Sequence, residues 1–183
     1  MTSKFGRAVT VALLGLVVQG AWAQPAANLP IPGIEPARDV PGAHLVPNPS
    51  TTYKVVFDVR AAAKDVGDVN PGLVAVARYV NTLAKYGVPA EHRKIAAVIH
   101  RDATEIILDD AAFKARHDGH DNPNLELIRA LKRAGVDLHV CGQAVLAYKI
   151  EPKTIVPEIQ LDLWAFTTFI ELQQQGYIRA GGG

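Results

Sequence analysis

The stretch "NPNLELIRALKRAGVDLHVCGQ", residues 122–143, predicts a helix, a turn, a strand and the start of another helix in direct succession. Asn122 and the proline after it are typical of a helix start, and Gly135 is typical of a helix end. Between them, hydrophobic residues recur at helical spacing and predict one buried helix face: Leu125, Ile128 and Leu131. The run "VDLHVC", residues 136–141, then predicts a strand. This order of elements is typical of an α/β protein.

The same alternation of strand and helix extends over residues 53–180. Strands are predicted at residues 53–59, 94–100, 136–141, near 157–161 and at 177–180. Helices are predicted at residues 70–87, 101–116, 122–135, 144–150 and 163–175. In the second helix, Asp102 and Glu105 have the spacing of a capping box. We therefore predict a single α/β domain with about five strands, a mainly parallel sheet and helices on both faces, as in a flavodoxin-like three-layer fold.

Residues 1–23 are predicted to be a signal peptide. Two basic residues precede the apolar run "AVTVALLGLVV" (8–18), and "AWA" (21–23) fits the small-residue pattern of a signal-peptidase site. The apolar run is shorter than the roughly 20 residues of a membrane-spanning helix. Cleavage near Ala23 would deliver the protein to an oxidising compartment, most simply the periplasm.

The segment after the predicted cleavage site is rich in proline. Residues 24–52 contain seven of the chain's prolines and have no apolar period, which predicts an extended arm rather than a core element. Such an arm could lie across its own domain or across a neighbouring subunit. The closing glycines, residues 181–183, are predicted to be a flexible tail.

The charge balance excludes some classes of partner. The chain of 183 residues has 19 basic and 18 acidic residues, for a net charge of +1. Nucleic-acid binding needs a basic surface, and binding to a membrane surface needs a basic amphipathic helix. We therefore predict no nucleic-acid partner, and no membrane association once the signal peptide is removed.

Cys141 is the single cysteine of the chain. In an exported protein, an unpaired cysteine indicates an intermolecular bond, a reactive thiol or an inert buried residue. Its position favours reactivity, because ligands of parallel sheets bind at the carboxyl ends of the strands. Gly142 permits a tight turn, and the amides of Gly142 and Gln143 at the start of the next helix would favour the thiolate. A cysteine packed beneath that helix is the alternative.

Two histidines are candidates for partners of this thiol. His139 lies two residues before Cys141 on the same face, where it could pair with the thiolate or help to bind a soft metal. Strand geometry favours instead a buried histidine bound to a backbone carbonyl beneath a helix. His100 ends its strand at the same edge of the sheet, so it could hold a substrate sulfur or act as an acid or base. The alternative for His100 is a loop-capping role.

No cofactor or metal site is predicted. The segment "RHDGHD", residues 116–121, has His117 and His120 three residues apart with aspartates beside them. It lies in a polar linker without a third or fourth converging ligand, which favours a solvated loop over a zinc site. Glycine-rich phosphate loops, the Gly-x-Ser-x-Gly elbow and Cys-x-x-Cys pairs are absent from the sequence.

Several segments resemble the DsrE/DsrF-like sulfur-relay family, in its exported branch. They are "VIHRDAT", "LDDAAFKAR", the block at 122–143 and the ending "LQQQGYI". The resemblance covers residues 53–180 and implies a parallel α/β domain that assembles as homotrimers or homohexamers. It also implies that the matching cysteine, Cys141, carries a persulfide between a donor and an acceptor. Arg101 is a departure, because the family often has a small residue, commonly glycine, after this histidine.

The leading hypothesis is therefore a periplasmic protein in which Cys141 accepts a sulfane sulfur and passes it on. His100 would act with Cys141, and Gly142, Gln143 and Arg101 would bind the substrate. The donor and acceptor are a partner protein or a small sulfur compound. One alternative is a binding or sensing module for a thiol, an oxidant or a soft metal, without turnover. The other is an oligomeric structural protein with an inert Cys141.

Overall fold

The computed structural model describes residues 29–180, so the predicted signal peptide and the glycine tail lie outside the described residues. Five strands form one sheet: β1 (Tyr53–Val59), β2 (Arg93–Ile99), β3 (Asp137–Cys141), β4 (Ile159–Asp162) and β5 (Ile178–Ala180). The α-helices are α1 (Pro71–Lys85), α2 (Asp110–Arg116), α3 (Leu125–Arg133), α4 (Gly142–Ala147) and α5 (Ala165–Gln174). Three 3₁₀ helices join them: η1 (Ala90–His92), η2 (Arg101–Ile107) and η3 (Pro152–Thr154).

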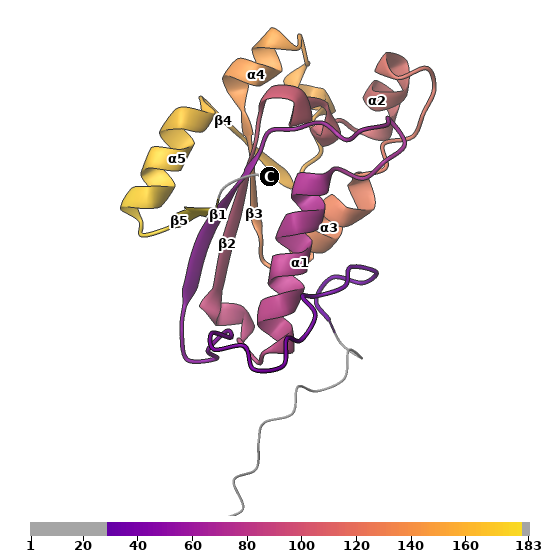
Figure 1. Ribbon diagram of the computed structural model, residues 1–183. Helices are drawn as coiled ribbons and strands as arrows, with labels where there is room; N and C mark the ends of the chain where they lie inside the picture. Colours follow the sequence, from indigo (N-terminus) through magenta and orange to yellow (C-terminus); the bar gives the residue numbers. More distant parts are fainter. Residues whose placement is uncertain (1–28, 181–183) are drawn as a thin grey trace, which may run out of the picture.

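All pairs in the sheet are parallel, in the order β4-β3-β2-β1-β5. Helices α1 and α3 cover one face and α5 covers the other, while α4 stands at the carboxyl-terminal edge (Figure 1). The prediction of one α/β domain with a five-stranded parallel sheet and helices on both faces is confirmed. Because β5 lies beside β1, the chain returns across the sheet after β4, and α5 spans that return.

Helix α1 begins where the sequence predicts. The Asn70 side chain accepts hydrogen bonds from the amides of Gly72 and Leu73, and Pro71 occupies the first helical position. This placement satisfies two amides that the helix itself leaves unpaired. The hydrophobic stripe of α1 faces the sheet and is almost fully buried: Leu73, Val76, Ala77, Val80 and Leu83.

The predicted helix at residues 101–116 is wrong in detail. The chain forms η2, leaves helical geometry at Leu108, which bridges to Ile155, and starts again as α2. Asp109, and not Asp102, caps this second helix, through a hydrogen bond from the amide of Ala112. The contact with Ile155 explains the break, because a residue in a β-bridge cannot continue a helix.

The start of α3 also differs from the prediction. The helix begins at Leu125, and Asn122 is not its cap. The buried Asn122 amide instead donates to the carbonyl oxygens of Ile106 and Leu108, at the end of η2. Asn122 therefore links the segment before α3 to the end of η2. Local sequence cannot distinguish this role from helix capping.

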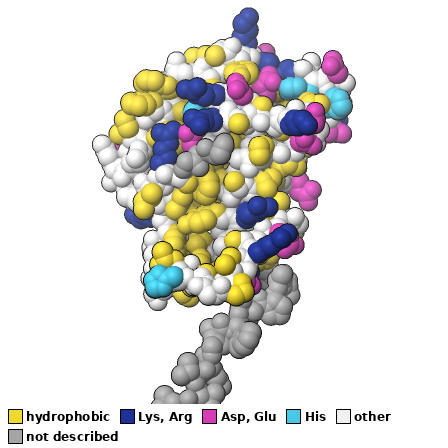
Figure 2. Space-filling model, in the orientation of Figure 1, with side chains coloured by type: hydrophobic (Ala, Val, Ile, Leu, Met, Phe, Trp, Pro, Cys, Tyr) yellow, Lys and Arg dark blue, Asp and Glu magenta, His cyan; other side chains and the backbone are white. Residues whose placement is uncertain are grey.

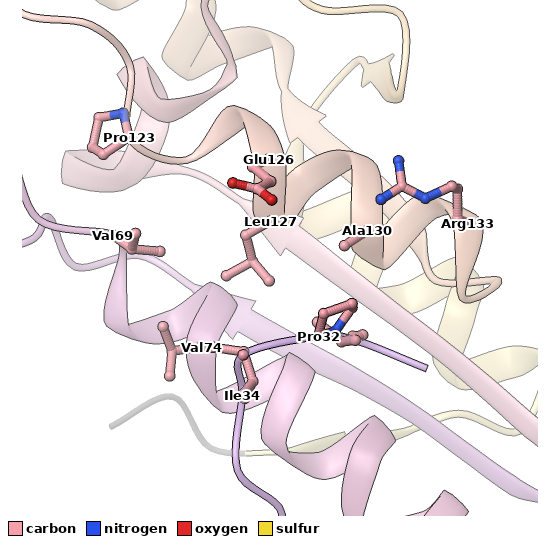
Figure 3. A pocket seen from close by; sticks show the side chains of 11 residues that line it. Pro32, Ile34, Val69, Val74, Pro123, Glu126, Leu127, Ala130 and Arg133 are labelled. Carbon is pink, nitrogen blue, oxygen red and sulfur yellow. The ribbon is translucent and has the colours of Figure 1, made fainter. Parts of the chain in front are cut away.

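The described part of the arm lies across its own domain. The buried Asn81 of α1 accepts from the amide of Ile31 and donates to the carbonyl oxygens of Ile31 and Ile34. Ile31 itself is 1% exposed. Pro32 and Ile34 lie over Val74 and Leu127, and with α3 they border a hollow of about 360 Å³ (Figure 3). The arm thus adds a short third segment to the layer made by α1 and α3.

Among the helices of residues 29–180, none has the length and apolar character needed to span a bilayer.

Candidate active site around Cys141

Three consecutive strands of the sheet bring side chains of opposite chemistry to its carboxyl edge, beneath α5. Asp58 is the last residue but one of β1, His100 directly follows β2, and Cys141 ends β3. The register pairs Ile99 with Val140, so the next residues, His100 and Cys141, occupy facing positions on neighbouring strands. Facing positions of adjacent strands are about 5 Å apart between their backbones.

Cys141 is 4% exposed, and its Sγ accepts a hydrogen bond from the amide of Ala165 at 3.2 Å. Ala165 is the first residue of α5, so the sulfur lies at the positive end of a ten-residue helix. A backbone N–H and a helix N-terminus both stabilise negative charge on a sulfur atom. The amide that reaches the thiol therefore belongs to a helix that starts 24 residues later in the sequence.

His100 does not cap the loop that follows it. Its Nε2 lies 2.6 Å from Oδ1 of Asp58, and the edge of its ring meets Phe169 of α5 at 6.1 Å between ring centroids. The His100 side chain is 14% exposed. The carboxylate fixes the orientation of the imidazole and can balance its charge when it is protonated.

Asp58 is buried and lies between the imidazole of His100 and the guanidinium of Arg179. Its Oδ1 faces His100, and its Oδ2 accepts from Nη2 of Arg179, at 2.5 Å, from strand β5. Burial alone would raise the pKa of Asp58, but the hydrogen bonds from Arg179 and His100 outweigh it and hold the pKa below its usual 3.8. The guanidinium of Arg179 also stacks over Phe169, 3.9 Å from the ring centroid. The result is a fixed cluster of Asp58, His100, Phe169 and Arg179.

His139 lies on the other side of Cys141 and is bound differently from the prediction. Its Nδ1 is 2.9 Å from Oδ2 of Asp162, a carboxylate of β4 rather than a backbone carbonyl. The hydroxyl of Thr168 donates to the same Oδ2 at 2.7 Å. The expectation of a histidine beneath a helix is met, since Thr168 belongs to α5. The two candidate histidines are therefore each held by an aspartate.

The three residues predicted to bind substrate lie at the rim of the site. Gln143 is exposed and its Nε2 donates to the carbonyl of Leu163 at 3.3 Å. Arg101 is exposed and has a φ of 53°, a left-handed conformation that favours glycine. A glycine, the residue expected here from the resemblance, would adopt that conformation without strain. Whether these residues touch a substrate stays a prediction.

The histidines of the polar linker take part in other contacts. Nε2 of His117 is 3.2 Å from Glu105, and its ring packs against Phe113. His120 is exposed. Within residues 29–180, no three His, Cys, Asp or Glu side chains converge in a metal-binding arrangement.

At Gly142, the start of α4 lies very close to the backbone at the end of β4. A Cβ at this position would lie 2.6 Å from the carbonyl oxygen of Asp162 and 3.1 Å from that of Leu163. Backbone atoms cannot move aside as a flexible side chain can, so only glycine lets α4 start this close to β4.

We expect Gly142→Ala to lower the free energy of unfolding by about 1–3 kcal/mol, the usual cost of overpacking. The strain would also separate β3 from β4 and increase the rate at which Cys141 is alkylated. Gly67→Ala is the matched control, because a Cβ there meets no atom within 4 Å. Urea unfolding of both variants decides: equal losses in the two would contradict the close approach.

Sequence reasoning missed several residues of the site, among them Asp58, Arg179 and Ala165. Asp58 could have been noticed, because it is a carboxylate near the end of the otherwise apolar strand "YKVVFDV". Arg179 could have been noticed as a charged residue in the last strand. The participation of Ala165 could not have been noticed, because it contributes only its backbone amide.

The chain matches the model of the DsrE/DsrF-like family over residues 53–178. The chain belongs to the DsrE/DsrF-like family. Membership connects it with sulfur relay, in which family members act together with partners.

Among solved structures, the chain is similar to a protein of unknown function, MTH1491, from Methanobacterium thermoautotrophicum. The two are 13% identical, with a TM-score of 0.50, and the match covers 71% of this chain and 99% of that chain. At this identity the similarity supports the fold of the DsrE/DsrF-like domain. A search among curated proteins found no match.

Proposed function

We propose that the protein accepts a sulfane sulfur on Cys141 as a persulfide and passes it on. The observation that carries the proposal is the Sγ of Cys141 at the N-terminus of α5, bonded to the amide of Ala165 and facing the position of His100. The amide and the helix end stabilise the thiolate that attacks, and then the persulfide anion that results. Membership of a sulfur-relay family supports the same chemistry.

The proposed transfer needs no external oxidant. The thiolate of Cys141 forms a bond with the outer sulfur of a donor R–S–S⁻, and the bond between the two donor sulfurs breaks. The electron pair leaves with the donor as a thiolate, so the donor sulfur is reduced as the Cys141 sulfur is oxidised. His100, held by Asp58 at 2.6 Å, is placed to supply the proton that the leaving thiolate takes up.

The test is sulfur loading measured by mass. Purified mature protein incubated with inorganic polysulfide is expected to gain the mass of one sulfur atom, and to lose it again on reduction. Cys141→Ser is expected to gain none, because hydroxyl groups are poor nucleophiles toward sulfur. A wild-type protein without the added mass would refute the carrier role.

The burial of Cys141 favours a second candidate, in which the thiol is an inert part of the core beneath α5. Its 4% exposure and its place beside Val98 and Phe169 fit a small hydrophobic residue. Alkylation of the native protein separates the two: an inert thiol reacts only as fast as the protein unfolds, whereas a functional thiol reacts faster near neutral pH.

We also propose that the protein acts in the periplasm and as a homo-oligomer. The predicted signal peptide at residues 1–23 supports the first, together with the single cysteine. The second is supported by hydrophobic side chains gathered along the groove between α1 and β1 (Figure 2). A second group of exposed hydrophobic residues follows β4: Leu163, Trp164, Phe166 and Ile170. Unpaired apolar surface of this kind is typical of protein interfaces.

A further inference from the structure

A hollow of about 450 Å³ opens between α5 and β4, the strand at the edge of the sheet. Figure 1 shows α5 and β4 side by side at this edge. The lining has three leucines and six polar residues: Leu161, Leu163, Leu172, His139, Asp162, Thr167, Thr168, Glu171 and Gln175. A space of this volume accommodates a small molecule and excludes a folded partner.

His139 supplies the hollow with a buried polar atom that lacks a partner. Its Nδ1 is bonded to the carboxylate of Asp162, so that nitrogen carries the hydrogen. Its Nε2 is buried and has no hydrogen-bond partner within residues 29–180. In the neutral ring this Nε2 has a free lone pair and accepts a hydrogen bond. A buried polar atom left unpaired is costly, and a ligand that donates to it removes the cost.

The charge of the hollow selects the ligand further. Asp162 and Glu171 are both carboxylates, and the lining has no lysine or arginine. Glu171 forms no ion pair with any residue in the range 29–180. The complement is a small molecule with a cationic, hydrogen-donating group, such as an ammonium, on a short apolar body.

The hollow lies next to the thiol. His139 precedes Cys141 by two residues on the same strand face, which corresponds to about 7 Å between their Cα atoms. Asp162 faces Cys141 in the register of β3 and β4. Leu172 lines the hollow and also packs in the hydrophobic cluster that contains Cys141. A molecule of three or four bonds therefore spans the distance from His139 to the sulfur.

We propose that this hollow binds the sulfur donor, and that the donor is the hydropersulfide of a small aminothiol. The inference rests on the proposed function of Cys141. The ammonium group contacts Glu171 and Nε2 of His139, and the outer sulfur reaches Cys141. Transfer then forms the Cys141–sulfur bond, breaks the sulfur–sulfur bond of the donor and releases the aminothiol as a thiolate, which takes a proton from His100.

The test compares two donors of similar length and opposite charge. Hydropersulfides of cysteamine and of 3-mercaptopropionate are mixed with the mature protein, and the rate of sulfur addition to Cys141 is followed by mass spectrometry. We expect the amine to load about tenfold faster than the carboxylate, because two carboxylates attract the one and repel the other. Inorganic polysulfide, which has no organic group to bind in the hollow, serves as the check that Cys141 can be loaded at all.

Variants test whether the preference for the amine donor comes from the hollow. Glu171→Gln is expected to reduce the tenfold ratio to about threefold, since one of the two carboxylates loses its charge. Glu151→Gln, an exposed carboxylate outside the hollow, is expected to leave the ratio unchanged. Leu163→Trp is expected to slow loading by the amine several-fold, whereas Leu146→Trp on α4, also exposed, is not.

Each outcome bears on a different claim. If polysulfide does not load the wild-type protein, the proposed function fails. If polysulfide loads but the two hydropersulfides react at equal rates, or Leu163→Trp has no effect, the hollow is not the donor site. If polysulfide loads and neither small hydropersulfide does, the donor is a protein persulfide, which also overturns the inference.

Discussion

Asn81→Ala is expected to lower the free energy of unfolding by about 3 kcal/mol, the sum of three hydrogen bonds of about 1 kcal/mol each. Asn81 is fully buried, and its amide pairs with both backbone groups of Ile31 and with the carbonyl of Ile34. Alanine leaves those groups unpaired, so the arm either retains the cost or leaves α1. Release of the arm would also expose Ile31, which is 1% exposed in the structure.

Two measurements check this prediction. Urea unfolding gives the change in free energy, and limited proteolysis shows whether residues 29–52 become cleavable while the domain stays intact. Thr82→Val is the matched control, because the neighbouring Thr82 also binds the arm, at Ala37, but at an exposed position. Equal stability and equal protease resistance in Asn81→Ala and in the wild type would show that the arm is not held by this side chain.

The position of Asn81 could have been noticed in the sequence. It interrupts the buried stripe of α1 between Val80 and Leu83, and a polar residue on a buried helix face needs a partner. The identity of that partner was not predictable. The arm has no period of its own, and its path depends on a hydrogen bond between residues 50 positions apart.

The strands and most helices were predictable because their hydrophobic runs are bounded by strong local signals. β1 has the predicted bounds of residues 53–59, and α1 starts at the predicted Asn-Pro pair. Prediction failed at residues 101–116, where the break depends on the bridge between Leu108 and Ile155. A tertiary contact of this kind leaves no trace in the local pattern.

The candidate site was also predictable only in part. Cys141 and His100 were predictable because both end a strand, and parallel strands end at the same edge of the sheet. The order of the strands was not, since alternating strands and helices fit many orders. Without knowing that β5 pairs with β1, no argument could bring Arg179 to Asp58. The return of α5 over the sheet, which brings Ala165 to the thiol, depends on the same fact.

Asp58→Asn is expected to lower the free energy of unfolding by about 2 kcal/mol at neutral pH. The carboxylate accepts hydrogen bonds from His100 and from the guanidinium of Arg179, and hydrogen bonds to a charged group contribute about 1.5–3 kcal/mol each. The figure is reduced because Arg179 is 42% exposed, so water screens its part. Asparagine keeps the size of the side chain but turns an N–H donor toward either His100 or Arg179, which are donors themselves.

The loss should depend on pH in a defined direction. The pKa of Asp58 in the folded protein lies below 3.8, because the hydrogen bonds from Arg179 and His100 outweigh the effect of burial. Its stabilising contribution is therefore complete above the unfolded value of about 3.8 and is lost as the pH falls through the lower folded value. The difference between the wild type and Asp58→Asn should be constant from pH 7 to about pH 5 and shrink in more acidic solution.

A second readout separates a positioning role from a structural one. Asp58 holds the ring of His100 through a contact of 2.6 Å, so its loss frees the imidazole to turn away from the thiol. We expect the pH profile of Cys141 alkylation to move to higher pH in Asp58→Asn, and Asp58→Glu to restore part of it. Asp137→Asn, an exposed aspartate of β3, should change neither stability nor the profile. Should Asp58→Asn lose stability with an unchanged alkylation profile, Asp58 supports the fold but does not act on the thiol through His100.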